Sequence, residues 1–182
     1  MPAISAVRPG GTLPGAKKIL PGAAPVGAVP RTYVLKVAID NRHLNFRYEP
    51  KAANHMPTDK ALDMRVYDAV NKIELILDGT DLDWYFPVGD DTITFTSWDI
   101  GDPDDRYVGL EFDQLDPNDP TRAKKLSFYA TRYDRPDGAG GKLPNTDQIN
   151  IRVVLDQDVN KVMTDSLFLY IDPGIKNPGD GR

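Results

Sequence analysis

From Tyr33 onward, apolar and polar residues alternate along the chain, and this two-residue period restricts the fold more than any other feature. The apolar positions on either side of a turn at Asp40–Arg42 are Tyr33, Leu35, Val37 and Ile39, then Leu44, Phe46 and Tyr48. A period of two places alternate side chains on the same face of a β-strand. The segment is therefore predicted to be a β-hairpin.

Eight further segments are predicted to be short strands. They are residues 63–67, 73–77, 84–86, 92–96, 107–112, 126–132, 149–155 and 167–171. Only Lys60–Asn71 competes as a helix, because it has apolar residues four apart, but its β-branched and aromatic residues favour strand for at least half of it. Short strands separated by Asp-, Gly- and Pro-rich turns predict an all-β fold, namely an antiparallel β-sandwich of jelly-roll or immunoglobulin-like type.

The first 31 residues differ from the rest in composition and charge. They hold prolines at positions 2, 9, 14, 21, 25 and 30, and proline lacks a backbone donor and biases the preceding residue toward extended geometry. We predict an extended N-terminal arm over residues 1–31 and a β-sandwich body over residues 32–182. The arm has four basic residues and no acidic one (+4), which leaves 18 basic against 27 acidic residues (−9) in the body.

These charges bear on the partners of the chain. An acidic body is a poor binder of phosphate backbones, so no direct nucleic-acid partner is expected. We expect the arm to be free at its beginning, and 31 extended residues reach roughly 100 Å, beyond the body to which they belong. Its positive charges would be attracted to the acidic surface of a neighbour.

The arm and body together predict a non-enzymatic, self-assembling structural protein. The arm would clamp copies of the chain or another structural protein, as in a virion shell, decoration or tail component, or in an ordered inclusion. The residues expected to do this are Arg8, Leu13, Lys17, Lys18, Ile19, Leu20, Val26, Val29 and Arg31. The alternative is a disordered tail with no such role.

The sequence contains no recognised catalytic motif, which is consistent with a non-enzymatic structural protein. The sequence contains no cysteine, which excludes disulfides, thiolate zinc sites and cysteine nucleophiles. It also has no GxSxG, HExxH, Walker or GxGxxG motif. We therefore predict that the chain is not an enzyme. A pocket that brought two carboxylates together, such as Asp83 and Asp99, would contradict that prediction.

Clustered aspartates are the best metal candidates. Asp99, Asp102, Asp104 and Asp105 fall in one short segment, and Ca²⁺ takes six to eight oxygen ligands, often from closely spaced aspartates. The competing interpretation is ordinary turn chemistry, in which each Asp bonds to its own backbone. No cofactor other than this calcium is expected.

Aromatic residues near the acidic clusters suggest a second function. Trp84, Tyr85 and Trp98 could form a ligand platform, with rings stacking on sugar faces while carboxylates accept hydroxyl hydrogen bonds. The alternative function is thus a carbohydrate-binding β-sandwich module, assisted by calcium. Core packing is the simpler explanation of the same residues, since Trp and Phe dominate sandwich interiors.

The C-terminal sequence IDPGIKNPG, residues 171–179, resembles the strand-plus-DP ending of the DP-EP family of small bacterial proteins. It departs from that pattern because no acidic residue follows the second proline. The resemblance implies an all-β bacterial or bacteriophage protein and no particular activity. No apolar run is long enough to span a membrane and no signal peptide is recognised, so we expect a chain that is cytoplasmic when made, even if it later joins a particle.

Overall fold

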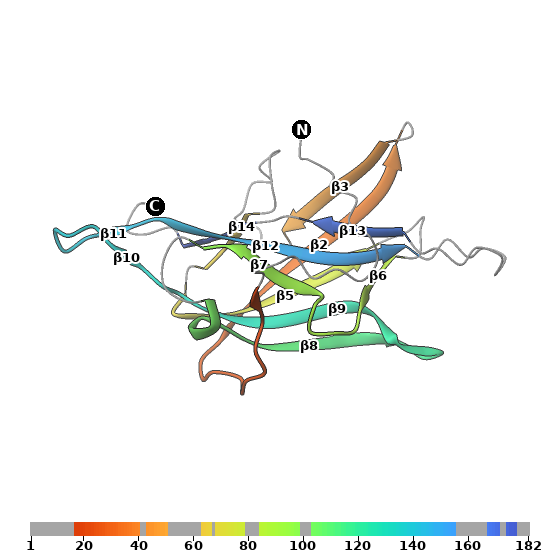
Figure 1. The fold of residues 1–182 in the computed structure, drawn as a ribbon, viewed down its shortest axis with the longest axis horizontal. Helices are drawn as coiled ribbons and strands as arrows, with labels where there is room; N and C mark the ends of the chain where they lie inside the picture. The colour runs from red at the N-terminus through yellow and green to blue at the C-terminus, as the bar shows by residue number, and fades with distance from the viewer. Residues whose placement is uncertain are drawn as a thin grey trace.

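The computed structural model describes residues 17–40, 43–50, 63–66, 68–78, 84–98, 103–155, 167–171 and 174–177 (Figure 1). Strand is the main secondary structure of these residues and helix is nearly absent from them, which confirms the predicted all-β fold. The strands are β1 Lys17–Lys18, β2 Val29–Asp40, β3 His43–Pro50, β4 Asp63–Arg65, β5 Val70–Asp78, β6 Trp84–Pro87, β7 Ile93–Ser97, β8 Tyr107–Asp116, β9 Asp119–Thr131, β10 Arg135–Pro136, β11 Lys142–Leu143, β12 Asn145–Leu155, β13 Leu167–Ile171 and β14 Gly174–Asn177. A single 3₁₀ turn within the described part, η1 Pro103–Asp105, precedes β8.

Twelve of the described strands form one mixed sheet, whose main order is β1-β7-β12-β6-β9-β5-β2-β3. Most pairings are antiparallel, but β2 pairs with β5 and β14 pairs with β4 in parallel. Strands β10 and β11 form a separate two-stranded ribbon. The sandwich type expected from the sequence stays a prediction.

The predicted hairpin is present as β2 and β3, in which Tyr33 pairs with Pro50 and Asp40 with His43. The segment that competed as a helix contains β4 and the beginning of β5 where it is described. Val66, between them, is buried. In the described part of the chain, no helix is long and apolar enough to cross a membrane.

One hydrophobic core joins strands from both ends of the sheet order. The ring of Phe95 in β7 stacks on that of Tyr107 in β8 with centroids 4.5 Å apart, and Tyr107 meets Phe128 in β9 edge-on at 6.4 Å. Trp84 and Phe86, alternate residues of β6, are fully buried in the same core. Alternation therefore sends Tyr85, which lies between them, toward the other face.

The residues around β1 pack onto their own body. Lys17 and Lys18 pair with β7, and Ile19 is only 3% exposed within the core. The amide of Gly109 donates to the carbonyl of Leu20 at 2.9 Å. Gly109 has a positive φ of 71°, and a Cβ there would lie 3.0 Å from the Tyr129 ring, so this close approach requires glycine.

Replacing Ile19 with alanine should reveal how much this contact contributes to stability. Because the side chain is buried, Ile19→Ala should lower the free energy of unfolding by about 2–5 kcal/mol. Val26→Ala is the matched control, since Val26 is fully exposed, and it should change stability by less than about 0.5 kcal/mol. Urea denaturation followed by tryptophan fluorescence measures both; equal effects of the two variants would contradict the docking of this segment.

Candidate functional site

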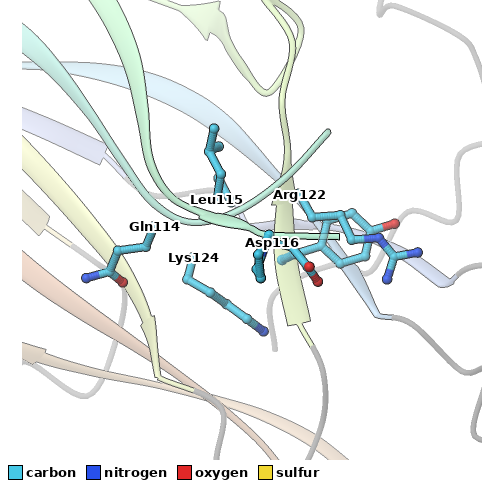
Figure 2. Close-up of a pocket in the computed structure, with 8 residues that line it drawn as sticks. Gln114, Leu115, Asp116, Arg122 and Lys124 are labelled. Carbon is cyan, nitrogen blue, oxygen red and sulfur yellow. The ribbon is translucent and has the colours of Figure 1, made fainter. Parts of the chain in front are cut away.

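A pocket of about 240 Å³ lies where β6 meets the β8–β9 hairpin. Its lining residues are Tyr85, Gln114, Leu115, Asp116, Pro117, Arg122, Ala123 and Lys124. In the view of Figure 2, Asp116 lies between Lys124 and Arg122, whereas Gln114 extends away from them. Three strands thus contribute an aromatic ring, two cations and one carboxylate to one concave surface.

Turn chemistry fixes the shape of the hairpin at this pocket. Asp116 Oδ1 accepts a hydrogen bond from the amide of Asn118 at 2.8 Å, and Asp119 Oδ1 accepts one from the amide of Thr121 at 3.0 Å. Such bonds from Asp to the backbone two residues on are typical of tight turns. The register of the β8–β9 pair also shifts at Leu115, which marks an irregularity beside the lining residues.

The two cations of the lining come from one face of β9. Arg122 and Lys124 are two residues apart, so their side chains leave the strand on the same side. The Arg122 guanidinium lies 4.7 Å from the Tyr85 ring centroid, and its Nε is 2.7 Å from Asp119 Oδ2. Lys124 Nζ donates to the carbonyl of Trp84. Hydrogen bonds from the Thr121 hydroxyl and amide lower the pKa of Asp119, so its carboxylate stays charged beside Arg122.

A second polar cluster is buried at the other end of β8. Arg106 and Asp147 are 3% and 0% exposed, and Arg106 Nη1 lies 3.0 Å from Asp147 Oδ2. The Tyr107 hydroxyl donates to the same oxygen at 2.6 Å. Burial, and then the charge of Asp147, raise the pKa of Tyr107 well above its ordinary value, so the hydroxyl stays protonated and remains a donor. Sequence reasoning singled out none of these three residues.

The structure places the predicted arm residues in different environments. Arg8 and Leu13 lie outside the described residues. Lys17 and Lys18 form ion pairs with Asp104 and Asp90 at 3.2 and 2.9 Å. Ile19 is buried, whereas Leu20, Val26 and Val29 are exposed.

Arg31, the last predicted arm residue, belongs to β2 and pairs with Asp68 at 2.5 Å. The described contacts of residues 17–31 are therefore with their own chain. A partner bound through the arm stays a prediction.

The predicted aromatic platform is divided among three locations. Trp84 is fully buried in the core, Tyr85 lines the pocket, and Trp98 packs against the core with Lys17 Nζ 5.7 Å from its ring centroid. Only Tyr85 is thus placed where a pocket is formed.

The predicted calcium ligands are mostly beyond the described residues. Asp99 and Asp102 lie outside them, and so does the side chain of Asp105. Asp104 pairs with Lys17. Within the described ranges, no three His, Asp or Glu side chains gather as a metal site would require. The calcium site stays a prediction.

Comparison with protein families matches residues 19–180 to the family described as predicted novel nucleotide synthetase. Nearly the whole chain is covered, so the chain belongs to this family. No curated protein matches it. The class that the fold and this match define is an all-β member of a family of predicted nucleotide synthetases.

This family assignment corrects four predictions. The resemblance to the DP-EP family is wrong, because it rested on nine C-terminal residues, whereas the match spans residues 19–180. The structural, self-assembling function and the carbohydrate-binding alternative are wrong, because the family is described as a predicted nucleotide synthetase. The prediction that the chain is not an enzyme is also wrong, because a synthetase family points to catalysis. The absence of known catalytic motifs does not exclude catalysis, because each motif identifies only the folds that carry it.

The buried cluster can be tested by removing one hydroxyl. Tyr107→Phe leaves the Asp147 carboxylate with one donor fewer in a dry site, so it should lower the free energy of unfolding by about 1–3 kcal/mol. Tyr85→Phe, at the half-buried pocket position, is the control and should stay within about 0.5 kcal/mol of wild type. Guanidinium denaturation measures both. A Tyr107→Phe protein as stable as wild type would show that the bond is not formed in solution.

Proposed function

We propose that this protein is a nucleotide-processing enzyme and that it binds a nucleotide in the pocket between β6 and the β8–β9 hairpin. The observation that carries the proposal is the convergence of Arg122, Lys124, Asp116 and Tyr85 on one pocket in a chain that belongs to a nucleotide synthetase family. Each of these side chains matches one part of a nucleotide.

The cations match the phosphates. Arg122 and Lys124 place two cations in the lining against one carboxylate, Asp116. The Asp119 carboxylate, just outside the lining, pairs with Arg122, so a phosphate would compete with Asp119 for the guanidinium. A guanidinium has five N–H donors in a planar fork, and the ammonium group of lysine has three. Both groups stabilise charge on phosphate oxygens, including charge that develops during transfer of a phosphoryl group.

The remaining lining residues match the nucleoside. Tyr85 presents an aromatic ring of the kind on which bases stack. The Asp116 carboxylate is an acceptor that suits a sugar hydroxyl or an exocyclic amino group. The pocket volume of about 240 Å³ is below the roughly 300–1,000 Å³ typical of drug-sized ligands. We therefore infer a mononucleotide rather than a dinucleotide as the ligand.

Isothermal titration calorimetry with the full chain tests this proposal. The ligands are ATP, GTP, CTP and UTP, and the corresponding monophosphates, each with and without Mg²⁺. We expect saturable binding by at least one of them. Arg122→Gln and Lys124→Gln should each weaken that binding about 10- to 100-fold, because each loses a hydrogen bond to a charged group.

Two control variants carry the same charge change away from the pocket. Lys72→Gln lies on β5, where Lys72 pairs with Glu111 at 3.7 Å, and Arg135→Gln lies on the exposed β10. Both should bind as wild type does. Tyr85→Phe should keep the affinity, whereas Tyr85→Ala should reduce it through lost stacking. Absence of binding across the panel, or equal losses in pocket and control variants, would overturn the proposal.

A further inference from the structure

The guanidinium of Arg106 has hydrogen-bonding capacity that the described residues do not use. Its nitrogens Nε, Nη1 and Nη2 are buried and have no aligned hydrogen-bond partner in the described part of the chain. The nearest carboxylate oxygen, Asp147 Oδ2, is 3.0 Å from Nη1 but also accepts the Tyr107 hydroxyl. Buried polar groups in folded proteins are nearly always satisfied, by protein, water or a ligand.

Covalent geometry shows which edge of Arg106 is left. Nη1 is the nitrogen cis to Cδ, and it is the guanidinium nitrogen that lies 3.0 Å from Asp147 Oδ2. Nε–H and Nη2–H point in the same direction along the opposite edge. That pair of parallel donors matches two oxygens of one carboxylate or phosphate, and such bidentate pairs are stronger and more specific than single hydrogen bonds. The edge that has no partner is therefore the one best suited to an oxyanion.

The rings of two tyrosines lie near this guanidinium. Its Cζ lies 5.7 Å from the Tyr107 ring centroid and 5.4 Å from that of Tyr133. Tyr107 is fully buried, whereas Tyr133 is 41% exposed. The backbone of Tyr133 is held by Asn145, whose Nδ2 donates to its carbonyl at 2.7 Å. Tyr133 is thus a partly exposed aromatic neighbour of the buried Arg106 guanidinium.

The segment that contains Tyr133 has a small excess of basic residues. The segment 132–145, which includes β10 and β11, carries three cations and two carboxylates in a chain of net −5. Arg132 and Lys142 both pair with Asp134, at 2.7 and 2.8 Å. This segment includes Tyr133, whose ring centroid lies 5.4 Å from Arg106 Cζ, and it has one cation more than it has carboxylates.

We propose that Arg106 binds a small oxyanion, a carboxylate or a phosphate group, on its Nε–Nη2 edge, next to Tyr133. This site is distinct from the nucleotide pocket. Arg106 precedes β8 and Asp116 ends it, so ten residues, or roughly 30 Å of strand, separate them. Figure 1 shows η1 and the β8–β9 turn toward opposite ends of β8. The two proposals can therefore fail independently.

The test follows the Nε–H resonance of Arg106 in the ¹⁵N-labelled full chain by NMR, assigned on the wild-type protein. Sodium phosphate, sodium acetate and sodium chloride are titrated at constant pH 7 and matched ionic strength. We expect a saturable shift with phosphate or acetate and none with chloride. The salt that produces the shift identifies the oxyanion as phosphate or carboxylate. No shift, or the same shift with chloride, would overturn the site and leave water as the partner of the edge.

Variants separate this site from the pocket. Arg122→Gln alters the pocket and should leave the Arg106 titration unchanged. Tyr133→Ala removes the partly exposed ring next to Arg106 and should preserve the saturable shift while changing its exchange rate. Arg106→Lys should weaken the anion-dependent rise in melting temperature at least tenfold in apparent affinity, because lysine has no bidentate edge. If Arg106→Lys does not fold, the wild-type resonance still decides the question, and an unaltered resonance refutes the proposal.

Discussion

The first two residues of β6 pair with β12, and the last two pair with β9. This four-residue strand therefore joins the part of the sheet that contains β7 and β12 to the part that contains β5, β8 and β9. Its register also determines the direction of each side chain: Trp84 and Phe86 enter the core, and Tyr85 lines the pocket. A shift by one residue would exchange these faces, so the pocket depends on the same pairing that closes the core.

The buried charge pair joins the same two parts of the sheet at another point. Asp147 belongs to β12, whereas Arg106 and Tyr107 lie at the beginning of β8. Moving two charges out of water is costly, and a buried pair seldom repays that cost in stability. What the pair does provide is a specific contact, because a misaligned β12 would leave Asp147 without its donors. The apolar residues around it could tolerate small displacements that this carboxylate could not.

The strands whose faces alternate in hydrophobicity could be predicted from sequence, and the polar ones could not. The β2–β3 hairpin was found because one side chain in two is apolar. Strand β8 ends later than predicted and β9 begins earlier. These parts were missed because the hairpin from Asp113 to Arg122 is mostly exposed and its apolar and polar residues alternate little. The candidate site lies in this polar extension. Tyr85 was singled out as an aromatic residue, but the convergence of Arg122 and Lys124 with it depends on the pairing of strands distant in sequence.

The short strand β1 has a role that its two residues do not suggest. A strand at the edge of a sheet presents unpaired amides and carbonyls that can recruit a strand from another molecule. By pairing with Phe95 and Thr94, Lys17 and Lys18 cover the edge of β7 that β12 does not occupy. The charge of the two lysines also discourages further strand addition next to them. Loss of this segment by proteolysis would leave the backbone amides and carbonyls along this edge of β7 without their β1 partners and open to pairing with a strand of another molecule.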